Sequence, residues 1–357
     1  MEVSKMIHLS FFTKYSTQGA TSRYRSFAFA SRLVELNYNI EIHSFMDIHY
    51  LSNLFAKKPK NKWRIFLSYC QRLFAVLRSS DNIVIERELF PYLPYGFEKI
   101  FLRNKQYILD FDDNVWEDYR GKLLLNGKYD HLIKNAAGVI VGNNYLEQYV
   151  KKINSNVIKI PTVINLGHYK QDKSVQKFER FSLVWIGSSV TYRYIKSFAP
   201  MFQQLSKLID FDLIIIASRQ LEIEKIEGVS MKFHDWSSEI ETVLLQQCHV
   251  GIMPLDNDDF SQGKSGFKLI QYQAAGLPMI ASPIGENTHI IADTINGYLA
   301  STLSEWVTAV QNLISDTELY NRMSTASKEK SYHYSIQHYF PIYKQFIDTT
   351  FHETCSK

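Results

Sequence analysis

Short apolar runs alternate with longer stretches of helical periodicity along most of this 357-residue sequence. Parallel strands produce such an alternation, because consecutive strands that run the same way need a long, usually helical, connection. The first series of expected strands is Met6–Phe12, Ile40–Phe45, Asn82–Glu86, Gln106–Leu109 and Gly138–Val141. The second series is Leu183–Ile186, Phe211–Ala217, Ser230–Phe233, His249–Met253 and Pro278–Ser282, with Tyr298–Ala300 as a short addition. The two series predict an α/β protein with two facing, doubly wound Rossmann-like domains.

A change in composition marks the boundary between these two domains. Pro161 and the polar stretch 170–179 separate the two series of strands, and the pattern after Ser301 is helical. A chain of this length is too long for one typical domain. We therefore expect an N-terminal domain over residues 1–168, a C-terminal domain over 169–335, and a last helix over 336–357 that packs back on the first domain.

The net charge of +4 is concentrated in one part of the chain. From Ile48 to Ser80 there are seven Lys or Arg residues and no Asp or Glu, and the rest of the chain is net negative. A local basic patch favours contact with something anionic, and it does not favour a whole surface built for nucleic acid.

Three further features bear on where the protein works. The three cysteines lack metal-ligand spacing, and the N-terminal sequence MEVSKMIHLSFF lacks the apolar core of a signal peptide. No uncharged apolar run reaches the roughly 18–20 residues that a membrane span requires. These features predict a cytoplasmic protein in a reducing environment.

The segment Gly251–Asn287 is the most informative one for function. Its expected strand ends in an acidic loop, and the turn Gly263-Lys264-Ser265-Gly266 then begins a helix at Phe267. The free N–H groups and the positive dipole end of such a helix form a natural anion site. Lys264 and Lys268 add positive charge there, as a pyrophosphate requires. The alternative is an ordinary crossover helix that carries surface lysines.

The same segment resembles a known family. Residues 271–282 read QYQAAGLPMIAS and are similar to the donor-binding helix of retaining family-4 glycosyltransferases of the GT-B fold. The string GKSGFKLIQY resembles a bacterial subgroup that builds surface polysaccharides. Gly263 and Gln271 stand where the family usually has two glutamates, which leaves the donor sugar open. Gln271 can still bond a ribose hydroxyl.

The resemblance implies a donor site in the second domain. The turn Gly187-Ser188 follows the first strand of that domain, and Arg193 lies close to the position of a basic residue that contacts donor phosphates in the family. A tight turn beside an exposed arginine is the alternative for this part of the site. The donor-binding residues expected are Gly187, Ser188, Lys264, Ser265, Gly266, Phe267, Gln271 and Asn287. The residues expected to act in catalysis are Arg193, Lys268, Asp112 and Asp113.

The first domain offers acidic and basic residues that follow its expected strands. The string Phe111-Asp112-Asp113-Asn114-Val115-Trp116 resembles an F-D-D-x-x-W string on the acceptor side of the subgroup's cleft. An Asp-x-Asp metal site, as in GT-A enzymes, is the alternative for Asp110 and Asp112. The acceptor-side residues expected are Arg23, Arg25, Glu86 and Arg87, each of which also reads as part of a surface charge cluster.

The basic stretch makes two separate predictions. Apolar residues at helical spacing predict the buried face of a crossover helix, at Phe66, Tyr69, Cys70, Leu73, Phe74 and Leu77. The basic cluster with its tryptophan predicts docking on an anionic membrane surface, through Lys57, Lys58, Lys60, Lys62, Trp63 and Arg64. Nucleic acid is the lesser option, because no recognised binding module surrounds the cluster.

Together these observations predict a metal-independent, hexosyl-type glycosyltransferase without a cofactor. It would move a sugar from a UDP- or GDP-sugar to a glycan or lipid-linked acceptor, with retention, in cell-surface polysaccharide synthesis. It would work in the cytoplasm, peripheral on the inner face of the cell membrane. A sugar-nucleotide epimerase on the same fold and a non-catalytic protein that binds glycan or nucleotide-sugar are the alternatives. The sequence contains neither a Gly-x-Ser-x-Gly motif nor a Walker-type motif, so it does not support a hydrolase or an NTPase function.

Overall fold

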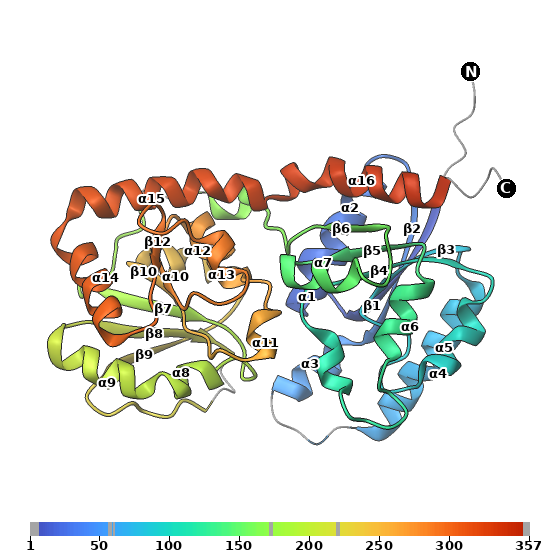
Figure 1. Ribbon diagram of the computed structural model, residues 1–357, viewed down its shortest axis with the longest axis horizontal. Helices are drawn as coiled ribbons and strands as arrows, with labels where there is room; N and C mark the ends of the chain where they lie inside the picture. Colours follow the sequence, from blue (N-terminus) through green and yellow to red (C-terminus); the bar gives the residue numbers. More distant parts are fainter. Residues whose placement is uncertain (1–6, 56–58, 60, 171–173, 219–221, 353–357) are drawn as a thin grey trace. The chain divides into compact units, whose positions relative to one another are not determined.

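The computed structural model describes residues 7–55, 59, 61–170, 174–218 and 222–352. The chain divides into two compact units. Unit 1 combines Met1–Val163 with Ile336–Lys357, and unit 2 is Ile164–Ser335. Each unit contains one six-stranded, all-parallel sheet with helices on both faces (Figure 1).

The sheet of unit 1 has the strand order β2-β1-β3-β4-β5-β6. Its strands are β1 (His8–Tyr15), β2 (Asn39–Met46), β3 (Asn82–Glu86), β4 (Gln106–Phe111), β5 (Gly138–Val141) and β6 (Val157–Lys159). The shorter helical segments that follow β1 and β4 in the chain are α1 (Ala20–Ser22), a π-helical turn (Arg23–Phe27) and a 3₁₀ turn (Val115–Tyr119). The other helices are α2 (Ala28–Val34), α3 (Ile48–Phe55), α4 (Lys62–Arg78), α5 (Tyr95–Leu102), α6 (Lys128–Asn135), α7 (Asn144–Val150) and α16 (Ile336–His352).

Alternating side chains of the unit 1 strands enter two apolar clusters, one on each face of the sheet. Ile83 and Ile85 of β3 pack in the cluster that α4 to α7 cover, and Val84 packs in the other one. That other cluster lies beneath α2 and α16, where the rings of Phe29 and Tyr343 stack with centroids 4.1 Å apart. The helix that ends the described chain is therefore part of the core of unit 1.

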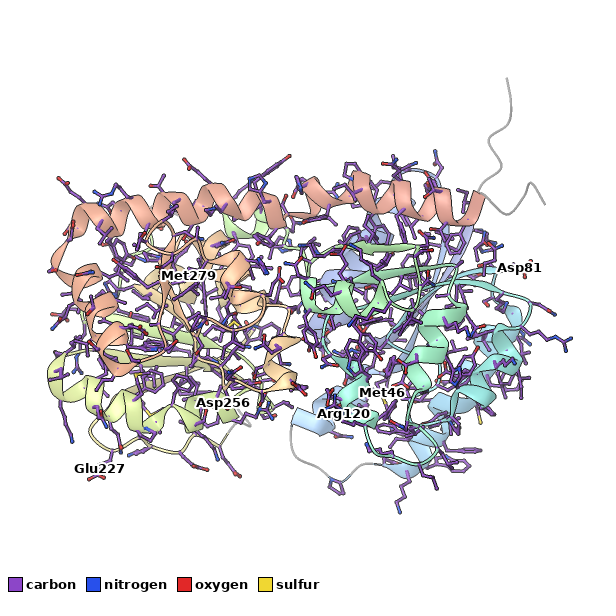
Figure 2. All side chains as sticks on the ribbon, in the orientation of Figure 1. Met46, Asp81, Arg120, Glu227, Asp256 and Met279 are labelled. Atoms are coloured by element: carbon purple, nitrogen blue, oxygen red, sulfur yellow. The ribbon has the colours of Figure 1, made fainter. Side chains whose placement is uncertain are left out.

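The sheet of unit 2 has the order β12-β11-β10-β7-β8-β9. Its strands are β7 (Ser182–Ile186), β8 (Asp212–Ala217), β9 (Ser230–Asp235), β10 (Val250–Met253), β11 (Met279–Ala281) and β12 (Gly297–Leu299). Its helices are α8 (Arg193–Ser197), α9 (Ala199–Leu208), α10 (Glu241–Gln247), α11 (Asp259–Gln262), α12 (Phe267–Ala275), α13 (Asn287–Ile290), α14 (Leu303–Ser315) and α15 (Thr317–Ser331). Side chains fill the space between sheet and helices, with Met279 inside the unit and Glu227 at its surface (Figure 2).

These sheets confirm the predicted α/β class with two Rossmann-like halves. One expectation about unit 1 was only partly right. Of the predicted buried face of α4, Tyr69 and Leu73 pack against the core, whereas the exposed fraction is 53% for Phe66, 60% for Phe74 and 63% for Leu77. The helix instead buries Arg72 and Val76, because the long arginine side chain reaches back to a backbone carbonyl of β1. None of the helices within the described ranges is long and apolar enough to cross a membrane.

Candidate functional site

The donor-side residues of unit 2 follow two neighbouring strands. β7 ends at Ile186 and β10 ends at Met253, and these strands pair in parallel, so their carboxyl ends meet at one edge of the sheet. Ligands in open α/β sheets bind at this edge. The turn Gly187-Ser188 and the loop that leads to α12 both lie there.

Gly266 fixes the start of α12 through its backbone conformation. This residue precedes the helix with φ +67°, a left-handed conformation that glycine adopts without steric cost. A Cβ atom at Gly266 would also lie 2.3 Å from Cδ1 of Ile290. The glycine thus allows α13 to pack closely against the beginning of α12, and this helix begins at Phe267, where the sequence predicts it.

Three basic side chains gather around two aromatic rings at this edge. The guanidinium of Arg193 lies 4.9 Å from the ring centroid of Phe260, and the ammonium of Lys264 lies 4.1 Å from the same centroid. Lys268 Nζ lies 5.6 Å from the ring of Trp185, which belongs to β7. The structure therefore brings Arg193 and Lys264 together and places Lys268 beside the end of β7.

The acidic loop 256–259 moderates this positive charge. Asp258 accepts a hydrogen bond from the backbone N–H of Ser261 and lies 3.7 Å from the guanidinium of Arg193. It therefore holds the short helix α11 and orients Arg193. Burial is low here, with about half of each of these two side chains exposed, so this ion pair contributes little stability.

Two other expected donor residues are buried and bonded within unit 2. Gln271 is 5% exposed, and its amide nitrogen donates to Glu241 Oε1 at 2.8 Å. Asn287 is 1% exposed and donates to the carbonyl of Ser282 at 3.0 Å. Ser265 is also buried, whereas Phe267 is partly exposed. The structure thus separates the basic residues, which are partly or fully exposed, from an inner polar layer of buried side chains.

Glu241 belongs to that inner layer and was missed by the sequence reasoning. Its carboxylate accepts hydrogen bonds from Tyr169 at 2.7 Å and from the Trp236 indole at 2.6 Å, in addition to the one from Gln271. No sequence pattern marks this glutamate, because its partners are scattered along the chain. Glu241 lies on α10 and places its carboxylate beside Gln271, which lies on α12.

The acceptor-side residues of unit 1 lie at the carboxyl ends of β3 and β4, which pair in parallel. Arg87 follows β3 with φ +64°, an uncommon conformation for a residue with a side chain. Its guanidinium lies 3.6 Å from Asp112 Oδ1 and 3.7 Å from Asp113 Oδ2. Burial opposes the charge of Arg87, but these two carboxylates raise the pKa of its guanidinium. The structure therefore brings Asp112, Asp113 and Arg87 together.

Asp112 is buried and only partly satisfied. Its Oδ2 accepts a hydrogen bond from the hydroxyl of Thr162 at 3.3 Å, whereas its Oδ1 makes no hydrogen bond with any described residue. A buried polar atom in this state is unusual and calls for an explanation such as a ligand. Lys14 lies in the same neighbourhood, where burial and then the charge of Arg87 lower its pKa to about 8. No sequence motif marks this lysine.

Arg25 occupies a different environment from the one expected. It is 1% exposed, and its Nε and Nη2 donate to Asp110 Oδ1 at 2.8 and 2.5 Å. Its Nη1 donates to the carbonyl of Ile160. Arg25 thus lies in the interior of unit 1, where it bonds to Asp110 and to the backbone, and does not reach the surface. Arg23 is partly exposed, with its guanidinium 4.6 Å from the ring of Tyr24.

These contacts bear on the alternative Asp-x-Asp metal site. Asp110 is committed to Arg25, and Asp112 faces Arg87. Cations therefore already stand where a metal ion would bind. Among the described residues, no group of three or more His, Cys, Asp or Glu side chains is placed to hold a metal ion.

Glu86 is buried at the end of β3 and accepts hydrogen bonds from the hydroxyls of Ser22 and Ser26 at 2.8 and 2.9 Å. Burial raises its pKa from 4.5 to about 7, against the opposing effect of these hydroxyls and of Arg87. The folded protein therefore keeps a proton that the unfolded chain loses above pH 4.5. The resulting stabilisation is complete below pH 4.5 and is lost as the pH rises through 7.

We expect Glu86 to lower the free energy of unfolding of unit 1 by up to about 3 kcal/mol as the pH rises over this range, at about 1.4 kcal/mol per pKa unit. Hydrogen exchange of the β3 and β4 amides at several pH values measures it. Glu86→Gln should remove about half of the total slope, because Glu98, whose pKa burial also raises to about 7, contributes a similar share. Glu35→Gln, an exposed control, should leave the slope unchanged. An unaltered slope in Glu86→Gln would contradict this assignment.

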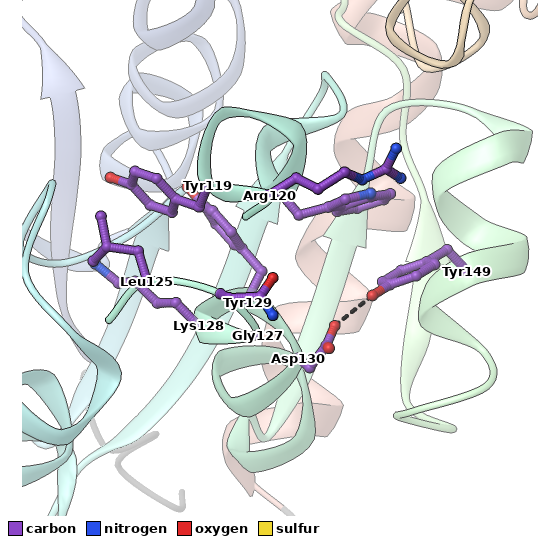
Figure 3. Close-up of a pocket in the computed structure, with 10 residues that line it drawn as sticks. Tyr119, Arg120, Leu125, Gly127, Lys128, Tyr129, Asp130 and Tyr149 are labelled. Carbon is purple, nitrogen blue, oxygen red and sulfur yellow. Dashed lines mark hydrogen bonds between the residues drawn. The ribbon is translucent and has the colours of Figure 1, made fainter. Parts of the chain in front are cut away.

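A cavity of about 180 Å³ lies in unit 1 next to the Phe111–Trp116 string (Figure 3). Its walls combine aromatic and charged residues, namely Trp116, Tyr119, Tyr129, Tyr149, Arg120 and Asp130. The rings of Trp116 and Tyr149 stack with centroids 4.2 Å apart, and the hydroxyl of Tyr149 donates to Asp130. Flat apolar rings beside hydrogen-bonding groups can hold a molecule that is itself apolar on one face and polar at its rim.

The comparisons with known proteins agree with this architecture. The model of the family described as Glycosyl transferases group 1 matches residues 180–316. The structure is similar to a sucrose-phosphate synthase from Thermosynechococcus elongatus, with a TM-score of 0.75 and 12% identity over 98% of this chain and 100% of that one. No curated protein matches the chain by sequence.

Two further solved structures extend the comparison. A glycosyltransferase from Rickettsia africae has a TM-score of 0.65 and 13% identity, over 97% of this chain and 99% of that one. HepE of Anabaena in complex with UDP-glucose has a TM-score of 0.66 and 13% identity, over 96% and 99% of the two chains. The chain thus has a GT-B-like fold that it shares with glycosyltransferases, and the sequence of its second unit matches the family of group 1 glycosyl transferases.

Proposed function

We propose that this protein is a glycosyltransferase that moves a sugar from a nucleotide diphosphate-sugar to a glycan or lipid-linked acceptor. We further propose that it retains the anomeric configuration, requires no metal, and acts in the synthesis of a cell-surface polysaccharide. One observation carries the proposal. Arg193, Lys264 and Lys268 gather at the carboxyl edge of the unit 2 sheet, beside the first turn of α12.

The chemistry requires positive charge at that place. When the bond from the anomeric carbon to the donor diphosphate breaks, the electron pair leaves with the diphosphate. A bond to the acceptor oxygen forms, and the proton of the acceptor hydroxyl passes to the departing diphosphate. Fixed cations and the N–H groups at the start of α12 stabilise the charge on the leaving diphosphate. Stabilisation of this kind is usually the largest single contribution to catalysis. HepE, a structural neighbour, is known in complex with UDP and with UDP-glucose.

Unit 1 would supply the acceptor side. Asp112 Oδ1 is a buried carboxylate oxygen without a hydrogen bond from any described residue, so it can accept one from an acceptor hydroxyl. The cavity beside Trp116 suits one sugar ring of an acceptor, since it is smaller than the roughly 300–1,000 Å³ of most ligand pockets. These two features support the acceptor role of the Phe111–Trp116 string.

The donor role of Lys268 can be tested by nucleotide binding. We expect UDP or GDP to raise the melting temperature of the wild type, because a ligand that binds only the folded protein stabilises it. Lys268→Ala should weaken nucleotide binding about tenfold, by roughly 1.4 kcal/mol, without lowering the melting temperature of the free protein. A thermal-shift series over UDP, GDP and their sugar conjugates measures both effects.

Lys207→Ala is the matched control, because Lys207 is exposed on α9 of the same unit. It should respond to nucleotide as the wild type does. Equal responses from Lys268→Ala and the wild type would contradict the phosphate role. Turnover with and without a lipid-linked acceptor then separates the activities, since an epimerase converts the donor alone and a binding protein converts nothing. The anomeric configuration of the product tests retention.

A further inference from the structure

The outer side of α4 carries an apolar stripe that the described residues of unit 1 leave exposed. We call the outer stripe of α4 the exposed residues Trp63, Phe66, Leu67, Phe74 and Leu77. Their exposed fractions run from 41% to 66%. At 3.6 residues per turn they fall within an arc of about 100° and extend over roughly 20 Å of the helix.

The opposite side of the same helix anchors it to the sheet. Arg72 and Val76 are buried, and Arg72 Nη2 donates to the carbonyl of Thr13 on β1 at 2.6 Å. The Tyr69 hydroxyl donates to the carbonyl of Pro91. Because these contacts fix the rotation of α4 about its axis, the outer stripe is held outward as a preformed surface.

Basic residues accompany the outer stripe of α4. Lys62 and Arg78 are exposed at the two ends of the helix, and Arg64 is exposed within its first turn. Arg64 forms an ion pair with Asp47, at 3.4 Å, on the surface of unit 1. Residues 48–80 contain no Asp or Glu, and Lys57, Lys58 and Lys60, which lie outside the described residues, precede the helix in sequence. The whole segment is therefore positive.

We propose that the outer stripe of α4 docks on a lipid bilayer that contains anionic lipid. Aromatic side chains partition to the boundary between headgroups and acyl chains, and Trp63 and Phe66 stack with ring centroids 5.4 Å apart at one end of the stripe. The flanking Lys and Arg side chains reach the anionic headgroups, each strengthening binding about fivefold. A second copy of this chain fits less well, because a symmetric contact would bring two positive segments together.

Vesicle flotation tests this proposal on the full chain and without any donor, so its outcome is independent of the proposed transferase activity. We expect the protein to bind vesicles of phosphatidylcholine with about one third phosphatidylglycerol, and to bind phosphatidylcholine alone at least tenfold more weakly. High salt should reduce the binding, because it screens the attraction to the headgroups. Phe66→Ser/Phe74→Ser should weaken the binding about tenfold, and Lys62→Gln/Arg78→Gln should weaken it more than tenfold.

Matched controls come from unit 2. Val190→Ser/Leu208→Ser removes two side chains with similar exposure, 66% and 61%, and Lys207→Gln/Lys225→Gln removes the same charge. Both should bind as the wild type does. Failure of the wild type to bind anionic vesicles, or wild-type binding by the outer-stripe variants, would overturn the proposal. A dimer of the wild type that Phe66→Ser/Phe74→Ser dissociates would assign the stripe to a contact between copies and overturn it as well.

Discussion

We expect Lys128→Met to lower the free energy of unfolding of unit 1 by about 3–5 kcal/mol. The ammonium of Lys128 is fully buried, 2.6 Å from Glu88 Oε2 and 2.7 Å from Glu98 Oε1, and it also donates to the carbonyl of Phe90 at 2.8 Å. Methionine fills a similar volume, but it leaves two buried carboxyl groups without their only close cation among the described residues. The loss is large because desolvation of these groups is no longer balanced.

The pH dependence of this variant distinguishes lost charge from lost packing. Burial already raises the pKa of Glu98 to about 7, and the charge of Lys128 opposes that rise. Without the lysine the pKa of Glu98 rises further, so the variant should regain more stability than the wild type does as the pH falls through 7. Hydrogen exchange of the β3 and β4 amides at pH values on both sides of 7 measures this recovery in unit 1 alone.

Lys151→Met is the control, since Lys151 pairs with Glu147 on the surface of α7, at 3.0 Å and with 57% of the lysine side chain exposed. It should cost less than about 0.5 kcal/mol. A loss of similar size in the two variants, or a Lys128→Met variant whose stability does not change with pH, would contradict the charge argument.

The second large effect concerns the buried pair of Arg25 and Asp110. Both side chains are at most 2% exposed, and the two Arg25 nitrogens that contact Asp110 converge on one carboxylate oxygen. Asp110→Asn removes the negative charge and leaves the guanidinium buried without a counter-charge at that position. We expect a loss of about 3–4 kcal/mol in unit 1, measured by urea unfolding that is followed through exchange of the β4 amides.

A double variant separates the cost of an unpaired charge from the value of the pair itself. Arg25→Met/Asp110→Leu replaces both charges with apolar groups, and such replacements of a buried pair are often neutral. It should be more stable than Asp110→Asn, although the carbonyl of Ile160 loses its bond from Arg25. If the double variant were the less stable one, the pair would contribute net stability and our explanation would be wrong.

The sequence predicted those parts of the fold that local pattern encodes. β3 and β5 have the predicted bounds, and α12 runs from Phe267 to Ala275 as expected, since glycines in left-handed conformations stand at both of its ends. β6 was missed because three residues, Val157–Lys159, are too few to show a period.

Long-range pairing was harder to predict. Arginine and lysine usually lie at the surface, but Arg25 and Lys128 are buried. Their partners, Asp110 and Glu88, lie 85 and 40 positions away in the sequence. Nothing local distinguishes a buried charge from an exposed one, so the interior role of Arg25 could not be predicted. The prediction of a buried face on α4 was only partly right, for a different reason. Its apolar spacing was read correctly as one face of a helix, but periodicity alone does not tell which face meets the sheet.

Unit 1 is built from two distant parts of the chain, and this arrangement has a consequence for its synthesis. A ribosome releases residues in order, so every residue of unit 2 emerges before Phe346, Ile347 and Phe351, which complete the apolar cluster under α16. Unit 2 can finish folding on the nascent chain, while the part of the unit 1 sheet that α16 covers stays exposed until translation passes those residues. That exposed face makes the growing chain dependent on protection from aggregation over most of its synthesis.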